Sequence, residues 1–159
     1  MVGASDEPGI GPVAWGSDPG GLKTVAQPGS WLGLRDTPDA RWPYLRMSGT
    51  EVFRWAIGEM AGVGAEAMDL AGVGPRDLAA FIPHQANLRI CEKLASSLRL
   101  PATVRVATDL VETGNTSGAS IPLALDAMVA LGEVPAGGLA LLLGFGAGLT
   151  YAGQVIRLP

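Results

Sequence analysis

The order of apolar segments in residues 48–159 constrains the fold more than any other feature of this 159-residue sequence. Three short apolar runs of strand length, Leu78–Pro83, Val104–Ala107 and Leu139–Leu143, alternate with stretches in which apolar residues recur at helical spacing. A further strand-like segment, Tyr151–Leu158, follows the last run and predicts a terminal β-hairpin. This alternation is typical of an α/β fold in which helices cover a mixed sheet.

Three helices are predicted between these strands. The first begins near Ser48 and ends near Gly72, and Ser48 with Glu51 three residues later fits a capping box. The second follows the first apolar run and carries its apolar residues on one face. The third is Ile121–Leu131, with Pro122 near its first turn. In sheets of this kind, functional sites gather at the carboxyl ends of the strands.

Residues 1–46 differ in character from the rest of the chain, because they are rich in Pro, Gly and Trp. Two short strand-like pieces, Val13–Gly16 and Lys23–Gln27, are separated by the turn signal Asp18–Gly21. We therefore predict an irregular segment with short strands over 1–46, and the remainder of one domain over 47–159.

Composition and charge exclude several function classes. The formal net charge is −4 and the isoelectric point about 4.9, so nucleic acid is a poor partner. The single cysteine, Cys91, excludes an internal disulfide and a cysteine-rich metal cluster. No apolar run reaches the roughly 20 residues of a bilayer span, and the first residues do not resemble a secretory signal. We expect a cytoplasmic protein that is not inserted in a membrane.

Three segments carry candidate functional groups. His84, the only histidine, follows the strand Leu78–Pro83, where it is either a catalytic group or a structural side chain at a strand end. Asn115 lies in a turn-rich loop before the third helix, and an ordinary Asx turn is the alternative to a role as amide donor. Gly144–Gly148 predicts a tight turn that either only closes the hairpin or presents the Ala147 amide to a developing oxyanion.

These segments together resemble a known family. The order and spacing of Pro83–Asn87, Gly114–Ser117 and Gly144–Gly148 closely resemble the second half of β-ketoacyl-acyl carrier protein synthase III, and Met47–Phe53 resembles the start of that enzyme's first long helix in this half. The resemblance covers nearly the whole chain, from about Pro8. One departure is Gly118, where the family usually has alanine.

The resemblance implies a thiolase-like half with a mixed five-stranded sheet that is covered by helices and ends in a β-hairpin. In the family, a preceding half carries the nucleophilic cysteine, and Cys91 does not match it. We therefore interpret Cys91 as a small buried apolar residue. A complementary N-terminal half is the first partner that the resemblance implies.

The resemblance also implies roles for individual residues. His84 and Asn115 match the pair that hydrogen-bonds the malonyl thioester oxygen during decarboxylation, and the amide of Ala147 matches a donor to the second oxyanion. Phe145 resembles the residue that screens the nucleophile. Gly49 and Phe53, in the first long helix, resemble residues that line the channel for the phosphopantetheine arm.

Substrates and partners follow from the same resemblance. They are an acyl-CoA primer and malonyl-acyl carrier protein, both with phosphopantetheine arms, and the complete enzyme is expected to be a homodimer that needs no cofactor or metal. Acyl carrier protein is acidic, so we expect Arg54, Arg89 and Lys93 to form a basic patch for it; an ordinary solvated helix surface is the alternative.

The sequence is compatible with two function classes. The chain is either part of a condensing enzyme, whose nucleophile lies on the complementary half, or a non-catalytic remnant that binds carrier protein or dimerises. A weaker enzymatic variant is decarboxylation of a malonyl thioester by His84 and Asn115 alone. Retention of all three loop motifs favours the condensing enzyme.

Overall fold

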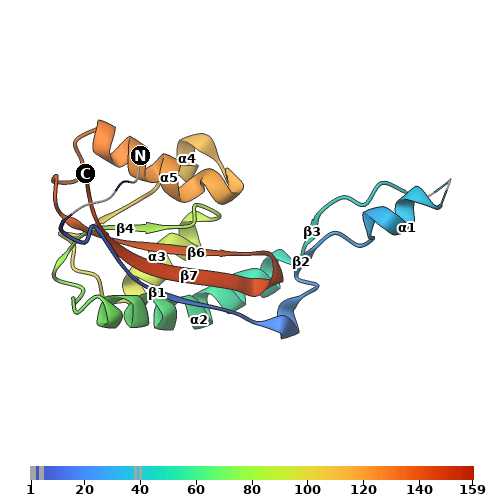
Figure 1. Ribbon diagram of the computed structural model, residues 1–159, viewed down its shortest axis with the longest axis horizontal. Helices are drawn as coiled ribbons and strands as arrows, with labels where there is room; N and C mark the ends of the chain where they lie inside the picture. Colours follow the sequence, from blue (N-terminus) through green and yellow to red (C-terminus); the bar gives the residue numbers. More distant parts are fainter. Residues whose placement is uncertain (1–2, 4–5, 38, 40) are drawn as a thin grey trace.

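The computed structural model describes residues 3, 6–37, 39 and 41–159. Five strands form the main sheet in the order β1-β7-β6-β4-β5, which confirms the predicted mixed five-stranded sheet (Figure 1). Strand β4 runs parallel to β5 and β6, whereas β7 is antiparallel to both β6 and β1. The strands are β1 (Ile10–Ser17), β4 (Leu78–Pro83), β5 (Arg105–Val106), β6 (Leu139–Gly146) and β7 (Thr150–Arg157).

Helices cover both faces of this sheet. Figure 1 shows α2 along one face and α4 with α5 on the opposite face. Residues of α2 and α3 share one apolar cluster with the sheet, and residues of α5 share a second cluster with its other face. The helices are α2 (Gly49–Leu70), α3 (Leu88–Ser97), α4 (Leu110–Thr113) and α5 (Ser120–Ala130).

Burial on both faces explains why the central strands are continuous apolar runs. In β4 the side chain of Phe81 packs into the α2–α3 cluster, whereas Ala80 and Ile82 pack into the α5 cluster. In β6 the side chain of Leu141 packs into the α2–α3 cluster, and Ala140 packs into the α5 cluster. Successive residues of a strand point to opposite faces, so a strand that is covered on both sides has no position for a polar residue.

The ends of α2 agree with the prediction, except for the capping box. Ser48 precedes the helix, but its side chain makes no capping hydrogen bond, so the predicted capping box is wrong. The amide of Glu51 instead donates to the backbone carbonyl of Ser48 (2.9 Å). At the other end, Gly72 takes a positive φ of 68° and its amide donates to Asp69 O, while the amide of Val73 donates to Met68 O. This pair of bonds is a Schellman motif, which requires a left-handed residue where the sequence supplies glycine.

Part of the segment predicted as irregular belongs to the main sheet. Strand β1 extends the predicted piece Val13–Gly16 at both ends and pairs with β7 at the edge of the sheet. The second predicted piece is reduced to β2 (Val25–Ala26), which pairs with β3 (Arg46–Met47) in a separate small sheet. The division of the chain at residue 46 stays a prediction.

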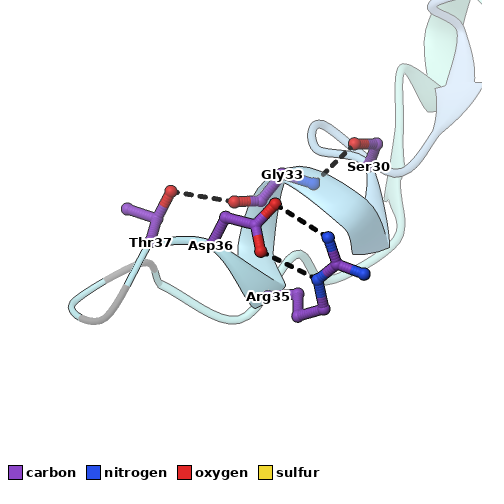
Figure 2. Close-up of polar contacts among 5 residues, drawn as sticks. All are labelled: Ser30, Gly33, Arg35, Asp36 and Thr37. Atoms are coloured by element: carbon purple, nitrogen blue, oxygen red, sulfur yellow. Dashed lines mark hydrogen bonds and ion pairs between the residues drawn. The ribbon is translucent and has the colours of Figure 1, made fainter.

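Between β2 and β3 the chain forms an arm that extends away from the main sheet and carries α1 (Trp31–Arg35) (Figure 1). Figure 2 shows the bonds that hold this short helix: Gly33 N donates to Ser30 Oγ (3.0 Å), Thr37 Oγ1 donates to Gly33 O (2.8 Å), and Arg35 pairs with Asp36 (2.8 Å). No residue of α1 is buried. Local polar contacts rather than a core therefore define this helix.

The terminal hairpin is confirmed, but its turn is shorter than predicted. Strand β6 continues through Gly146, which pairs with Thr150, so the first glycines of the predicted turn lie in the strand. The turn itself is Ala147–Leu149, where Gly148 has a φ of 71°. Only the last part of the Gly144–Gly148 segment therefore needs the conformational freedom of glycine.

Candidate functional site

The carboxyl ends of β4 and β6 bring two of the candidate segments together. The parallel register pairs Pro83 with Leu143, and the amide of His84 donates to Leu143 O (2.8 Å). His84 therefore lies beside the glycine-rich end of β6. After β4 the chain continues into α3, which packs on one face of the sheet, and α5, which precedes β6, packs on the other face. Where successive helices cover opposite faces in this way, a crevice opens at the carboxyl ends of the strands between them.

A pocket of about 360 Å³ lies at this edge of the sheet. It is lined from three directions: by the end of β4, by the loop and first turn that lead into α5, and by the end of β6 with its turn. The lining residues are His84, Ser117, Gly118, Ser120, Ile121, Gly144, Phe145, Gly146 and Ala147. Two predicted site residues besides His84, namely Phe145 and Ala147, are thus part of the same pocket.

The His84 ring is half-buried and held between two side chains. Its Nδ1 atom lies 2.6 Å from Ser120 Oγ, and its plane stands nearly perpendicular to the Phe145 ring, with 5.3 Å between ring centroids. Burial lowers the pKa of His84 below its ordinary value of 6.5. The imidazole is therefore neutral at pH 7, and one of its ring nitrogens carries a hydrogen that it can donate.

Phe145 connects the pocket to α2. Its ring contacts the ring of Trp55 in an edge-on arrangement with centroids 6.1 Å apart, and Trp55 also contacts Tyr151 at 6.0 Å. Phe145 is thereby fixed between α2 and His84. Sequence reasoning missed Trp55, although it lies three residues after Val52, which is buried on the face of α2 that packs against the sheet.

Asn115 is exposed and is not among the residues that line this pocket. Its Oδ1 atom accepts a hydrogen bond from the amide of Ser117 (2.9 Å), which forms the Asx turn that was the alternative reading of the sequence. The two readings are compatible, because a turn that engages Oδ1 leaves the Nδ2 hydrogens available to another acceptor. The roles of His84, Asn115 and Ala147 in one reaction stay predictions.

The residues predicted to line a channel lie outside the pocket. Gly49 is exposed at the first position of α2, and Phe53 is half-buried against the α2–α3 cluster. The three predicted carrier-protein contacts, Arg54, Arg89 and Lys93, are all exposed. Among the described residues, none of these three takes part in an ion pair.

Cys91 is fully buried in α3, and its Sγ atom lies 3.9 Å from the carbonyl oxygen of His84. Burial raises the pKa of the Cys91 thiol to about 11. A buried thiol with a raised pKa is a poor nucleophile, which fits the interpretation of Cys91 as an apolar core residue.

Two buried polar side chains beside His84 were not predicted. Gln85 is fully buried: its Nε2 donates to Pro83 O (2.7 Å) and Ala107 O (3.3 Å), while Leu110 N donates to its Oε1 (3.3 Å). Gln85 therefore ties the ends of β4 and β5 to the start of α4. Ser120, the first residue of α5, is also fully buried and contacts His84.

The described ranges, 3, 6–37, 39 and 41–159, contain no candidate metal cluster and no candidate membrane span. There, no three His, Cys, Asp or Glu side chains are grouped so that they could hold a metal ion. In the same part of the chain, no helix combines the length and the apolar character that crossing a bilayer requires.

A family model and a full-length relative both match this chain to synthase III proteins. Residues 68–158 match the family described as 3-oxoacyl-[acyl-carrier-protein (ACP)] synthase III C terminal. A β-ketoacyl-[acyl-carrier-protein] synthase III of Mycobacterium avium (strain 104) is 51% identical over 159 residues, which are 100% of this chain and 48% of that protein.

Solved structures agree with this match. The priming β-ketosynthase of the R1128 polyketide biosynthetic pathway has a TM-score of 0.94 and 50% identity over 99% of this chain and 47% of its own. The 3-oxoacyl-(acyl carrier protein) synthase III of Pseudomonas aeruginosa PAO1 has a TM-score of 0.85 and 36% identity, and again 47% of its chain is covered. The present chain thus spans about half the length of these proteins.

Proposed function

Because this chain belongs to the 3-oxoacyl-[acyl-carrier-protein] synthase III family and matches its C-terminal part, we propose that it supplies half of a decarboxylating condensing enzyme. The observation that carries the proposal is the placement of His84 beside Phe145 and the Ala147 turn in one pocket. A complementary N-terminal half supplies the nucleophilic cysteine.

The proposed reaction proceeds in two stages. The cysteine thiolate first takes the acyl group from acyl-CoA and releases CoA. Malonyl-acyl carrier protein then loses carbon dioxide: the bond between its carboxylate and C2 breaks, and the electron pair forms an enolate with negative charge on the thioester oxygen. C2 attacks the acyl carbonyl carbon, the bond from that carbon to the cysteine sulfur breaks, and 3-oxoacyl carrier protein leaves. The reaction needs only these two thioester substrates, with no cofactor or metal.

His84 contributes a neutral hydrogen-bond donor to that thioester oxygen. The oxygen gains negative charge only as carbon dioxide departs, so a fixed donor stabilises the transition state more than the bound substrate. In this proposal the Nδ2 group of Asn115 is the second donor, since its Oδ1 is already held by Ser117. The Ala147 amide serves the oxyanion that forms when C2 attacks the acyl group.

The ring of Phe145 shields the reacting carboxylate from water. Its edge-on contacts with His84 and Trp55 hold it at the pocket wall. An apolar wall disfavours the charged carboxylate and therefore favours its loss as carbon dioxide. Gly49 and Phe53 belong to the proposed channel for the phosphopantetheine arm, together with groups of the complementary half.

The proposed assembly is a homodimer of complete enzymes in the cytoplasm, and each complete enzyme contains this chain and one complementary half. The test is an assay of this assembled enzyme, made by mixing the chain with the N-terminal half of the Mycobacterium avium relative. We expect 3-oxoacyl carrier protein from acyl-CoA and malonyl carrier protein only when both halves are present. A complex that forms on a sizing column but gives no product would contradict the proposed function and favour a non-catalytic remnant.

Carrier protein is proposed to dock at the pocket end of α2 and α3. Arg54 precedes Trp55, whose ring contacts Phe145, and Arg89 lies in the first turn of the helix that follows His84. Lys93 is one helical turn beyond Arg89 on the same face. In this proposal the three exposed cations together form the surface that an acidic partner recognises on a chain whose net charge is −4.

Reversing the charge of this patch should weaken carrier-protein binding selectively. In the assembled enzyme, Arg54→Glu with Arg89→Glu should raise the KM for malonyl carrier protein about tenfold at low salt, because rim charges mainly steer association. The KM for the acyl-CoA primer should not change. Since exposed charges are screened beyond about 8 to 10 Å near physiological ionic strength, the difference should shrink as salt is added.

The matched control is Arg76→Glu with Arg99→Glu, which changes the net charge equally at the other end of α2 and α3, where both side chains are exposed. An unchanged KM in the Arg54 and Arg89 variant, or an equal increase in the control, would show that the patch is ordinary surface.

A further inference from the structure

Ser120 lies at the wall of the pocket, in contact with the only histidine of the chain. It is the first residue of α5 and is 0% exposed, and its Oγ atom is 2.6 Å from Nδ1 of His84. The contact joins residues 36 positions apart and connects the end of β4 to the start of α5. A buried hydroxyl needs partners for both its hydrogen and its lone pairs.

The second contact of Ser120 determines the direction of the first. The backbone amide of Gln85 donates to Ser120 Oγ (3.3 Å), so the oxygen is already an acceptor there. Among the described residues, His84 Nδ1 is the only other atom that hydrogen-bonds to this oxygen. If Nδ1 carried a hydrogen, Ser120 Oγ would accept twice and its own buried hydrogen would have no acceptor, which costs more than the bond gains.

The favoured arrangement therefore has the Ser120 hydroxyl donating to Nδ1 of His84. A neutral imidazole has one hydrogen, and with Nδ1 acting as acceptor that hydrogen is on Nε2. The lowered pKa of His84 keeps the ring neutral at pH 7, which agrees with this assignment. Nε2 is separated from Nδ1 by Cε1 and points away from Ser120, and His84 is one of the residues that line the pocket.

We propose that Ser120 is a positioning residue that holds His84 in the Nε2–H tautomer and aims this hydrogen into the pocket. For its catalytic consequence the inference rests on the proposed function, whereas the tautomer rests on the hydrogen bonds alone. The catalytic consequence is direct: a ring in the other tautomer presents a lone pair to the thioester oxygen and repels the charge that develops there.

The tautomer can be measured because the chain contains a single histidine. The chain is labelled with ¹⁵N-histidine and studied both alone and bound to an unlabelled complementary half. Two-bond correlation spectra at pH 7.5 then show one imidazole. We expect a hydrogen-bearing Nε2 and an unprotonated Nδ1 in the wild type. Hydrogen on Nδ1 in the wild type would overturn the proposal directly, without any variant.

Variants separate positioning from simple structural support. Ser120→Ala should give averaged nitrogen shifts that report a mixture of tautomers, whereas Ser120→Thr, which keeps the hydroxyl, should retain the wild-type pattern. Ser97→Ala, an exposed serine at the last position of α3, is the control for serine replacement in a helix. A folded Ser120→Ala chain with an unchanged spectrum would contradict the proposal. If Ser120→Ala does not fold, the wild-type spectrum and the spectrum of Ser120→Thr still test whether His84 is held in the Nε2–H tautomer.

Kinetics of the assembled enzyme test the catalytic consequence. Ser120→Ala should lower kcat for condensation about tenfold, which corresponds to the net free energy of one neutral hydrogen bond. The KM for the acyl-CoA primer should not change. Ser120→Thr should recover most of the rate. A shifted tautomer with an unchanged kcat would remove the catalytic consequence. If the wild-type assembly does not condense at all, the proposed function fails, while the spectra still decide the tautomer.

Discussion

Replacing His84 with alanine in the assembled enzyme should lower the rate of condensation by about a hundredfold to a thousandfold, the range found when one preorganised donor to an oxyanion is removed. Acyl transfer from acyl-CoA to the cysteine of the complementary half should change far less, because that step develops charge on a different oxygen. The two steps are measured separately, by CoA release in a single turnover and by carbon dioxide release from malonyl carrier protein.

His84→Gln is the informative companion variant. Glutamine can donate a hydrogen bond but lacks the fixed Ser120 contact, so we expect a rate between those of the wild type and His84→Ala. Thermal unfolding of each variant shows whether the fold is retained. Equal losses in both chemical steps would indicate general damage to the pocket, and no loss in either step would remove His84 from the mechanism.

The isolated 159-residue chain should form no acyl adduct and no condensation product. Cys91 is 0% exposed, and with a pKa of about 11 only about one Cys91 thiol in a thousand would be ionised at pH 8. The measurement is the intact mass of the chain after incubation with acyl-CoA, combined with an assay for 3-oxoacyl product. Both should be negative over the time in which the assembled enzyme completes many turnovers.

Cys91→Ala gives the matched test within the assembled enzyme. Because Cys91 acts as a buried apolar residue, this variant should lose some stability but keep its kcat. An acyl adduct on Cys91 of the isolated chain, formed together with product, would show that this half carries its own nucleophile and would overturn the division of roles between the two halves.

The regular elements of the fold could be predicted because their residue patterns are local. Strand β4 was predicted with its observed bounds, Leu78–Pro83, since an apolar run covered on both faces has sharp polar or glycine-rich ends. Helix α2 and its end near Gly72 followed from helical periodicity and a glycine at the position that takes a positive φ. Local patterns of this kind contain the information that sets such boundaries.

Features that depend on distant contacts could not be predicted in this way. The extent of β1 is set by its pairing with β7, more than 130 residues later in the sequence. The capping box at Ser48 fits the sequence rule, yet the structure has only backbone bonds there. Most relevant to the site, the contact between Ser120 and His84 depends on how α5 packs on β4, and no residue pattern near either position indicates it.

The candidate site also contains some features that the sequence predicted and others that it did not. The sequence predicted His84, Asn115 and the Gly144–Gly148 turn at one edge of the sheet, and of these His84 and the residues Gly144–Ala147 line the pocket. The local Asx turn at Asn115 was one of the two predictions from the sequence, whereas its exposure and its absence from the pocket lining were not predicted.

A double-mutant cycle on decarboxylation tests most directly whether His84 and Asn115 serve one oxygen. Carbon dioxide release from malonyl carrier protein is measured for four assembled enzymes: the wild type, His84→Ala, Asn115→Ala and the double variant. Groups that act as a unit are strongly non-additive, so we predict large losses for both single variants and a double variant only slightly slower than the slower single variant. Losses that multiply, or an Asn115→Ala enzyme as fast as the wild type, would contradict the shared role.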